Sequence, residues 1–191
     1  MPSQEAARLA DKVFAASIAL HERMRVNLGA TVLAAETMRD AVKAGRKLLV
    51  FGNGGSAADA QHMSSELVGR FQRERTAIAA IALTTDSSVL TSVANDYSFK
   101  QVFARQIEAL GQAGDVAFGI STSGDSPNIA LALQVARAKG LKTIALTGRD
   151  GGTIGPAAEI HVNVPDQSAA RVQEVHRTIL HVMCEVIESD L

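Results

Sequence analysis

The chain has 191 residues, enough for one α/β domain that buries roughly 70% of the surface exposed by its unfolded chain. Its 19 basic and 20 acidic residues give a net charge of −1 without any block of like charge, so a basic face for nucleic acid is not expected. No apolar run approaches ~18 residues and the first residues lack the apolar core of a signal peptide, so we expect a cytoplasmic protein that does not bind a membrane.

Two helices are predicted before the first strand. The first covers residues 3–28, where apolar side chains recur at helical intervals. The second covers residues 31–44, with Thr31 as its N-cap and Gly45 after its end. A doubly wound sheet does not need two extra helices. Residues 1–45 are therefore expected to pack against another subunit.

A strand, a glycine-rich turn and a helix are expected next. Residues 48–51 are an unbroken apolar run stopped by Gly52, which is typical of a strand buried on both faces of a parallel sheet. In the turn at residues 53–55, the glycines let the backbone take positive φ and approach a ligand closely. Ser56 is predicted to be the N-cap of the helix.

Two polar residues on that helix suggest a metal site. His62 and Glu66 are four residues apart, so both side chains project from one face. An imidazole and a carboxylate one turn apart suit Zn²⁺ or a similar borderline ion. A hydrogen bond on the helix surface explains the same spacing equally well, because polar pairs four residues apart are ordinary.

The glycine turn also fits the dinucleotide fingerprint G-x-G-x-x-A. That fingerprint requires an acidic residue at the end of the next strand, about 20 residues onward, to hold the ribose. The next strand, predicted at residues 77–83, is followed by two threonines, and the first acidic residue, Asp86, comes too late. A nicotinamide or flavin site is not favoured.

The remaining elements alternate between strands and helices. We expect helices near residues 86–94 and at 99–110, with Asn95 and Asp96 between them, a strand at 116–120, a helix at 126–139, a strand at 142–146, a strand at 160–164 and a closing helix at 168–188. This alternation predicts a single α/β domain over residues 1–191. The domain is expected to be a three-layer αβα sandwich with a five-stranded parallel sheet. Cys184, the only cysteine, is expected to pack as a small hydrophobe in the closing helix.

A hydroxyl-rich segment follows the strand at residues 116–120. Its hydroxyls belong to Ser121, Thr122, Ser123 and Ser126. Ligands of open α/β sheets bind at such strand ends, and Gly124 and the free amides of the next helix suit an anion. The segment therefore predicts a phosphate ester site, with Asp125 turned to solvent because a carboxylate repels phosphate. The alternative is that the serines only cap the helix.

Several motifs resemble the sugar isomerase (SIS) domain family. They are GNGGS at residues 52–56, STSG at residues 121–124 and the pair Gln173-Glu174. Longer runs at residues 52–71, 82–99 and 171–176 resemble the branch of that family that isomerises a seven-carbon sugar phosphate. The resemblance implies conversion of sedoheptulose 7-phosphate to D-glycero-D-manno-heptose 7-phosphate, a lipopolysaccharide precursor. It also implies a homotetramer with one Zn²⁺ per subunit and active sites at subunit interfaces.

The resemblance further implies roles for individual residues. Proton transfer is assigned to Glu66 and His181. The implied zinc ligands are His62, Glu66, Gln173 and His181. The implied substrate contacts are Asn53, Gly54, Gly55, Ser56, Glu66, Asn95, Asp96, Ser121, Thr122, Ser123, Ser126 and Gln173. The chain departs from the pattern at Ala170, where some members carry a polar or acidic residue, so a proton-transfer role at that position is lost.

Two questions stay open at the level of sequence. Glu66 could be the carbon base of an enediolate reaction, but binding an ion would lower its basicity, so its two roles compete. Gln173 and His181 are eight residues apart, about 12 Å along a helix axis, so either both side chains stretch or subunits share the site. His176 is the closer alternative to Gln173, and we expect it to be solvated on the helix surface.

Three other functions compete with this isomerase. The DnaA initiator-associating adaptors share the fold but lack counterparts of Glu66 and His181. Another sugar phosphate could be the substrate, because the hydroxyl segment reads a phosphate and not a carbon number. A regulatory sugar-phosphate sensor would need a DNA-binding segment, which the sequence does not suggest.

Overall fold

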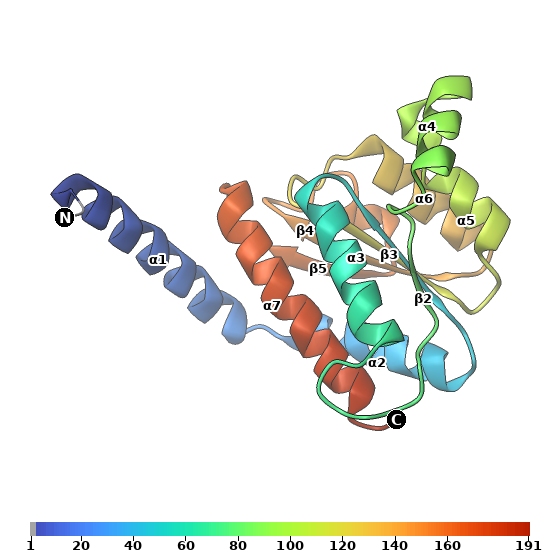
Figure 1. Cartoon of the computed structure of the whole chain (residues 1–191), viewed down its shortest axis with the longest axis horizontal. Coiled ribbons are helices and arrows are strands. Elements are labelled where there is room, and N and C mark those ends of the chain that lie inside the picture. Colours follow the sequence, from blue (N-terminus) through green and yellow to red (C-terminus); the bar gives the residue numbers. More distant parts are fainter. Residues whose placement is uncertain (1–2) are drawn as a thin grey trace.

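The computed structural model describes residues 3–191, and over these residues seven α-helices surround one five-stranded sheet (Figure 1). All the strands are parallel, in the order β2-β1-β3-β4-β5, so the predicted αβα sandwich is confirmed. The elements are α1 (Gln4–Arg25), α2 (Gly29–Lys43), β1 (Leu48–Gly52), α3 (Gly55–Val68), β2 (Ala80–Ala82), α4 (Ser87–Asp96), the 3-10 turn η1 (Phe99–Gln101), α5 (Ala104–Leu110), β3 (Val116–Ser121), α6 (Pro127–Ala138), β4 (Lys142–Gly148), η2 (Gly155–Ala157), β5 (Ile160–Val164) and α7 (Ala169–Glu188).

The sheet has two hydrophobic cores, one on each face. Side chains along β1 alternate between them: Leu48 and Val50 face the first core, Leu49 and Phe51 the second. Helices α2, α3 and α7 cover the first core, and α5 and α6 cover the second. Every residue of β1 is buried, as the unbroken apolar run predicted.

The strand order places the glycine turn and the hydroxyl segment side by side. The chain leaves β1 toward β2 on one side, whereas β3 lies on the other side, so the topology switches between β1 and β3. Gly52 at the end of β1 pairs with Ile120 near the end of β3. Ligands of open α/β sheets bind at the carboxyl ends of strands at such a switch point.

Two predicted N-caps are wrong. Thr31 lies inside the first turn of α2, because Leu28 already has helical dihedrals and the helix begins at Gly29. It is buried, and its hydroxyl has no hydrogen-bond partner among residues 3–191. Ser56 lies inside α3, because Gly54 takes the N-cap position with a φ of 55° that favours glycine. The expected glycine after α2 is confirmed, since Gly45 has a φ of 72°.

Other boundaries differ from the predictions. The first helix ends at Arg25, three residues early. The predicted helix at residues 99–110 is broken into η1 and α5. Strand β2 keeps only three residues of the predicted seven, and β4 runs two residues further than predicted. Asn95 and Asp96 are the last residues of α4 and not a link between helices.

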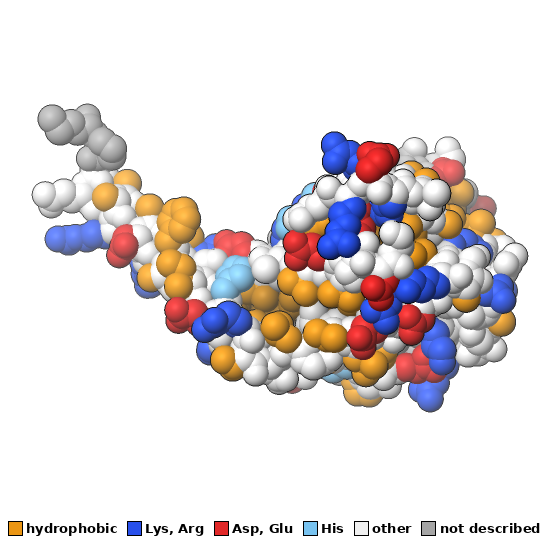
Figure 2. Space-filling view, turned by 90° about the horizontal axis from the view of Figure 1, so that it is seen from below, with side chains coloured by type: hydrophobic (Ala, Val, Ile, Leu, Met, Phe, Trp, Pro, Cys, Tyr) orange, Lys and Arg blue, Asp and Glu red, His pale blue; other side chains and the backbone are white. Residues whose placement is uncertain are grey.

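Helix α1 projects from the body of the molecule, as Figures 1 and 2 show. Only Leu20 of this helix is buried, whereas Leu9, Phe14 and Ile18 are 64%, 71% and 57% exposed. Over the described residues, no helix combines the length and apolar character needed to cross a bilayer.

Near the other end of the chain, Cys184 is buried as predicted, and burial raises the pKa of its thiol to about 12.

Candidate active site

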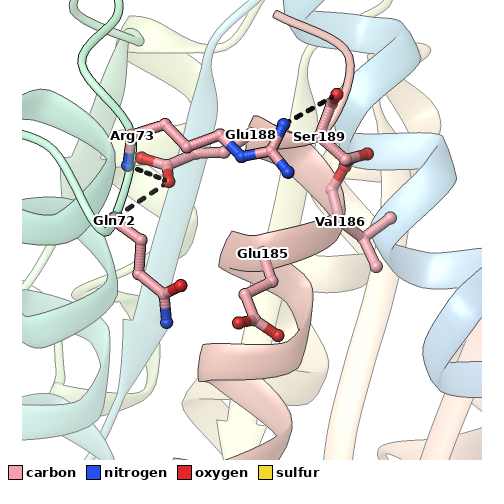
Figure 3. Close-up of a pocket in the computed structure, with 6 residues that line it drawn as sticks. All are labelled: Gln72, Arg73, Glu185, Val186, Glu188 and Ser189. Carbon is pink, nitrogen blue, oxygen red and sulfur yellow. Dashed lines mark hydrogen bonds between the residues drawn. The ribbon is translucent and has the colours of Figure 1, made fainter.

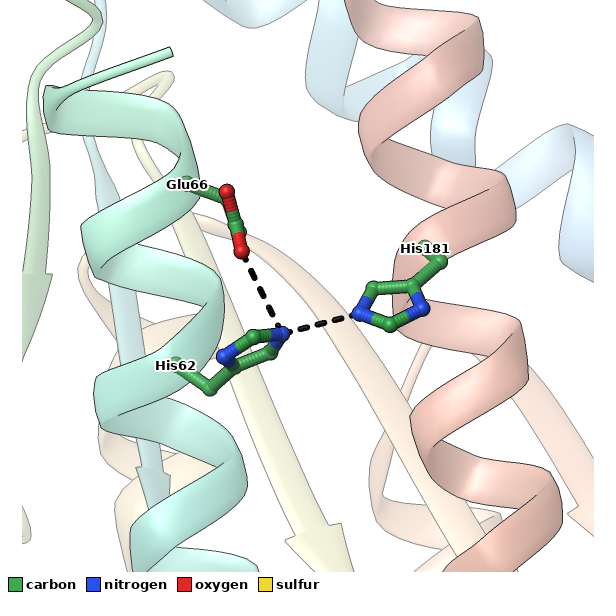
Figure 4. A group of neighbouring side chains, drawn as sticks. All are labelled: His62, Glu66 and His181. Carbon is green, nitrogen blue, oxygen red and sulfur yellow. Dashed lines mark hydrogen bonds and ion pairs between the residues drawn. The ribbon is translucent and has the colours of Figure 1, made fainter. Parts of the chain in front are cut away.

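The structure brings together three of the four predicted metal ligands. His62 and Glu66 project from one face of α3, and His181 projects toward them from α7 (Figure 4). The two Nε2 atoms are 2.8 Å apart, and Glu66 Oε1 lies 3.5 Å from His62 Nε2. We call these three residues the donor cluster. One ligand atom from each lies within 4.8 Å of the others, an arrangement that suits a single ion.

The chemistry of this cluster fits zinc. Imidazole nitrogens and a carboxylate oxygen are the ligands that zinc takes in open sites, and the imidazole must be neutral to bind. Burial lowers the pKa of His62, and the nearby Arg177 lowers it further, against the opposing effect of Glu66. A lowered pKa favours the neutral form of His62, which is the form that can coordinate a metal ion.

Gln173, the fourth predicted ligand, lies elsewhere. Its amide fills the space that a side chain at position 55 would need, which explains why glycine stands there. Gly55 precedes His62 on α3 by about two turns, and Gln173 precedes His181 on α7 by about two turns. Because α3 and α7 run in the same direction, the contact between Gly55 and Gln173 lies about two turns away from the contact between His62 and His181. In this chain, Gln173 therefore lies against Gly55 and outside the cluster of His62 and His181.

A hollow of about 660 Å³ opens beside Gln173. Its lining includes His21, Gly55, Ala58, Asp59, Ala170, Gln173, Glu174, Arg177 and Thr178. These residues belong to α1, to the start of α3 after the glycine turn, and to α7, so the hollow lies between α1 and the two helices that carry the donor cluster. Position 170 contributes no acid to this lining, as the sequence indicated, whereas Asp59 and Glu174 do.

Asp59 is a buried charged group that sequence reasoning missed. It is 1% exposed, and its Oδ1 accepts a hydrogen bond of 2.9 Å from Arg177 Nε, while its Oδ2 has no partner among the described residues. Burial raises the pKa of Asp59, and Arg177 opposes that shift. Its position three residues before His62 gave no signal, because a single acid on a helix is usually solvated.

The hydroxyl segment forms a compact group at the end of β3. Ser121 Oγ lies 3.1 Å from Ser126 Oγ and 3.3 Å from Ser123 Oγ. Ser126 is the N-cap residue of α6, but its hydroxyl makes no capping bond, so capping alone does not explain it. Gly124 has a φ of 76°, and a side chain there would strike the backbone of Gly151. Asp125 is exposed as predicted, and its carboxylate accepts from the Thr153 amide.

Asn53 links the glycine turn to the hydroxyl segment. Its amide and that of Asn128, in the first turn of α6, exchange two hydrogen bonds of 2.9 and 3.0 Å. The predicted substrate contacts that follow β1 and β3 therefore lie together at the carboxyl ends of these two strands. Ser56 is only 4% exposed, so little of it is accessible to a ligand.

The chain does not bring Asn95 and Asp96 to this site. They are exposed at the end of α4, and Asn95 Nδ2 donates to Asp96 Oδ1 at 2.9 Å. Within residues 3–191, neither side chain has a hydrogen bond to the donor cluster or to the hydroxyl segment.

The expectation that His176 is solvated is wrong. It is fully buried in α7, and its Nε2 donates to the Thr147 carbonyl at 3.0 Å. Burial lowers the pKa of His176 from 6.5 to about 4, although the hydrogen bond to Thr147 opposes the shift. The signal was present in the sequence, since Val172, His176 and Leu180 lie on one apolar face at intervals of four.

This burial predicts a loss of stability in mild acid. The folded pKa lies below the unfolded value, so the unfolded state binds more protons as the pH falls from about 6.5 toward 4, and the contribution present above pH 6.5 is lost. At pH 5, the free energy of unfolding should have fallen by about 2 kcal/mol through this group. Urea unfolding at pH 7.5 and pH 5 should show a smaller decrease for His176→Gln than for the unsubstituted protein. Equal decreases would contradict the assignment.

This geometry can be compared with known proteins. The SIS domain family matches residues 13–148. The match covers the glycine turn, the hydroxyl segment and four of the five strands. The parallel sheet, with the glycine turn and the hydroxyl segment at the carboxyl ends of its strands, is thus that of a sugar isomerase (SIS) domain protein.

Individual relatives narrow this class. A phosphoheptose isomerase of Citrifermentans bemidjiense is 59% identical over 152 residues, which are 80% of this chain and 79% of the relative. The solved phosphoheptose isomerase of Neisseria gonorrhoeae is 45% identical with a TM-score of 0.90, covering 97% of this chain and all of the other. That of Francisella tularensis is 38% identical with a TM-score of 0.92, covering 96% and 98%. This chain belongs to the phosphoheptose isomerase family of SIS domain proteins.

Proposed function

We propose that the chain is an aldose–ketose isomerase that converts sedoheptulose 7-phosphate to D-glycero-D-manno-heptose 7-phosphate. The observation that carries the proposal is the convergence of His62, Glu66 and His181, in a chain 59% identical to a relative named phosphoheptose isomerase. We further propose that the reaction takes place in the cytoplasm and supplies heptose for lipopolysaccharide precursors.

The reaction moves two protons. Glu66 takes a proton from carbon 1 of the ketose, which leaves an enediolate across carbons 1 and 2, and returns a proton to carbon 2. His181 passes a proton from the oxygen on carbon 1 to the oxygen on carbon 2. Imidazole suits this second transfer because it gains and loses protons near neutral pH.

A zinc ion, one per subunit, would be held by His62, Glu66 and His181. When bound, zinc supplies a Lewis acid that stabilises negative charge on the two reacting oxygens. Gln173 would be the fourth ligand only if its amide left Gly55, because the structure places it there. The open side of the donor cluster otherwise remains available to substrate.

The phosphate of the substrate would bind at the hydroxyl segment. Its proposed contacts are Ser121, Thr122, Ser123 and Ser126, at the positive end of α6. The proposed contacts along the sugar are Asn53, Gly54, Gly55, Glu66, Asn95, Asp96 and Gln173, and Ser56 would add only the small part of its surface that is exposed. Holding the phosphate at one end fixes the reacting carbons at the other.

Ser126 offers a clean test of the phosphate site. Because its hydroxyl does not cap α6, Ser126→Ala should fold normally. The variant loses a hydrogen bond to a charged group, worth about 1.5–3 kcal/mol, so the KM for sedoheptulose 7-phosphate should rise roughly 10- to 100-fold. Ser189→Ala, which removes an exposed hydroxyl at the end of α7, is the control. A KM unchanged in Ser126→Ala would place the phosphate elsewhere.

We propose that residues 1–45 help to assemble a homotetramer whose active sites lie at subunit interfaces. The exposed apolar side chains of α1 support this proposal, because such a stripe on a projecting helix needs a covering partner. The position of Asn95 and Asp96 also supports it. Residues that do not reach the site of their own chain would contact substrate in the site of a neighbouring subunit.

Phe14 should be essential for this assembly. Phe14→Asp places a charge on a ring that is 71% exposed in the single chain, so the mass in solution should fall to half of the tetramer or less. Light scattering after gel filtration measures that mass. Lys12 lies on the other side of α1, so Lys12→Asp should leave the tetramer intact. Tetramers in both variants would contradict the proposed interface.

Turnover separates the isomerase from its rivals. The protein should convert sedoheptulose 7-phosphate far faster than pentose or hexose phosphates. A non-catalytic adaptor would convert none of them, but the adaptors lack counterparts of Glu66 and His181. Both residues are present here, and a carboxylate oxygen of Glu66 lies within 4.8 Å of an imidazole nitrogen of His181, which favours the enzyme.

A further inference from the structure

A buried ion pair lies beyond the donor cluster, between the ends of α3 and α7. Arg75 Nε is 3.0 Å from Glu188 Oε1, and the two side chains are 3% and 1% exposed. Charged groups are rarely buried unless they are paired and hydrogen-bonded. The groups that surround this pair therefore indicate what it holds in place.

Glu188 binds the segment that follows α3. Its Oε1 accepts a hydrogen bond of 2.8 Å from the Phe71 amide, and its Oε2 accepts bonds of 3.0 and 3.1 Å from the amides of Gln72 and Arg73 (Figure 3 shows the last two). Burial alone would raise the pKa of Glu188, but these amides and Arg75 hold it below its ordinary value. The group is therefore a carboxylate at neutral pH.

Arg75 binds the last turn of α3. Its Nη2 donates to the Glu66 carbonyl at 2.8 Å, and its Nη1 donates to the Leu67 carbonyl at 2.8 Å. Carbonyls in the last turn of a helix lack helical partners. The guanidinium thus caps the helix that carries two members of the donor cluster, and it binds the backbone of Glu66 itself.

Phe71 covers the third member. Its ring stacks on the His181 imidazole, with centroids 5.3 Å apart and an angle of 28° between the planes. Within residues 3–191, Nδ1 of His181 has no hydrogen-bond partner, so the ring is oriented by Phe71 and by its contact with His62.

We infer that Glu188 and Arg75 are positioning residues that set the geometry of the donor cluster. Arg75 holds the end of α3, Glu188 extends from α7 two turns after His181, and the amide bonds of Glu188 place Phe71 on the imidazole. The inference rests on the proposed function for the chemistry of the cluster, but not for its geometry. Replacing a group that orients a metal ligand typically lowers metal affinity or activity by about 10- to 100-fold.

Two substitutions test the inference. Glu188→Gln keeps the shape of the side chain but removes its charge, and Phe71→Leu removes the ring. Each should weaken zinc binding by about 10-fold or more, measured by competition with a chromophoric chelator. Each should also shift the His181 signals in NMR spectra of the metal-free, ¹⁵N-histidine-labelled protein. Phe71→Tyr keeps the ring and should restore both properties.

Two controls separate positioning from general loss of stability. Glu74→Gln removes a carboxylate that is 90% exposed and adjacent to Arg75 in the sequence, and should change neither readout. Leu133→Ala opens a cavity in the core on the opposite face of the sheet. It should lower the melting temperature without altering zinc affinity.

Wild-type zinc affinity and imidazole signals in a folded Glu188→Gln variant would overturn the inference, as would equal losses in Leu133→Ala. If Glu188→Gln does not fold, Phe71→Leu decides by the same readouts. If the wild type takes up no zinc, the imidazole signals decide. If the wild type does not convert the sugar phosphate but Glu188→Gln still changes zinc affinity or the His181 signals, the proposed function is refuted and the inference is supported. If the wild type is active but Glu188→Gln changes neither readout, the proposed function stands and the inference is refuted.

Discussion

Replacing Glu66 with glutamine is expected to lower the kcat for sedoheptulose 7-phosphate by about 10²- to 10⁴-fold, the range for loss of a positioned acid/base group. The amide has the shape of the carboxylate but cannot take a proton from carbon. Glu66 is partly buried, with a side chain 22% exposed, and its Oε1 lies 3.5 Å from His62 Nε2, so the substitution changes a group inside the donor cluster. Steady-state turnover and the oligomeric mass should be measured together, since assembly should be unchanged.

The same variant decides whether Glu66 acts as base, as ligand or as both. If Glu66→Gln retains one zinc per subunit while turnover is lost, its main role is proton transfer. Lost zinc together with lost turnover would make it a ligand. Glu74→Gln is the control, because the Glu74 side chain is 90% exposed and its loss should have no effect. Wild-type turnover in Glu66→Gln would exclude both roles.

Removing the metal is expected to produce a loss of similar size. Dialysis against a chelator should abolish turnover, and Zn²⁺ should restore it whereas Mg²⁺ should not, because two imidazoles and one carboxylate are zinc ligands and not a magnesium site. Elemental analysis before and after dialysis should account for the activity.

Two variants provide the matched comparison for this experiment. His62→Ala removes a member of the donor cluster and should prevent recovery at the same zinc concentration. Glu74→Gln should recover fully, since the Glu74 side chain is 90% exposed and lies outside the donor cluster. Full turnover in metal-free protein would contradict a metal-assisted reaction.

Much of the fold could be predicted because its signals are local. The buried run at residues 48–51 and the alternation of strands with helices indicate a parallel sheet. The helix starts were harder to predict. Ser56 and Thr31 are good capping residues, but the conformations of Gly54 and Leu28 begin both helices earlier.

The site could be predicted in part. The spacing of His62 and Glu66 is visible in one helix, and the hydroxyls at 121–126 are visible in one loop. The approach of His181 depends on the packing of α7 against α3, which spacing along the chain does not encode. For the same reason, neither the burial of Asp59 nor the Glu188–Arg75 pair could be foreseen.

The central claim is that the donor cluster moves a proton between adjacent carbons of a phosphorylated ketose. The most direct test is to incubate the zinc-loaded protein with sedoheptulose 7-phosphate in D₂O and to follow the sugar by NMR. The proposal predicts D-glycero-D-manno-heptose 7-phosphate with deuterium on carbon 2. Recovery of the ketose unchanged, with no deuterium on carbon 1 and no aldose formed, would contradict it.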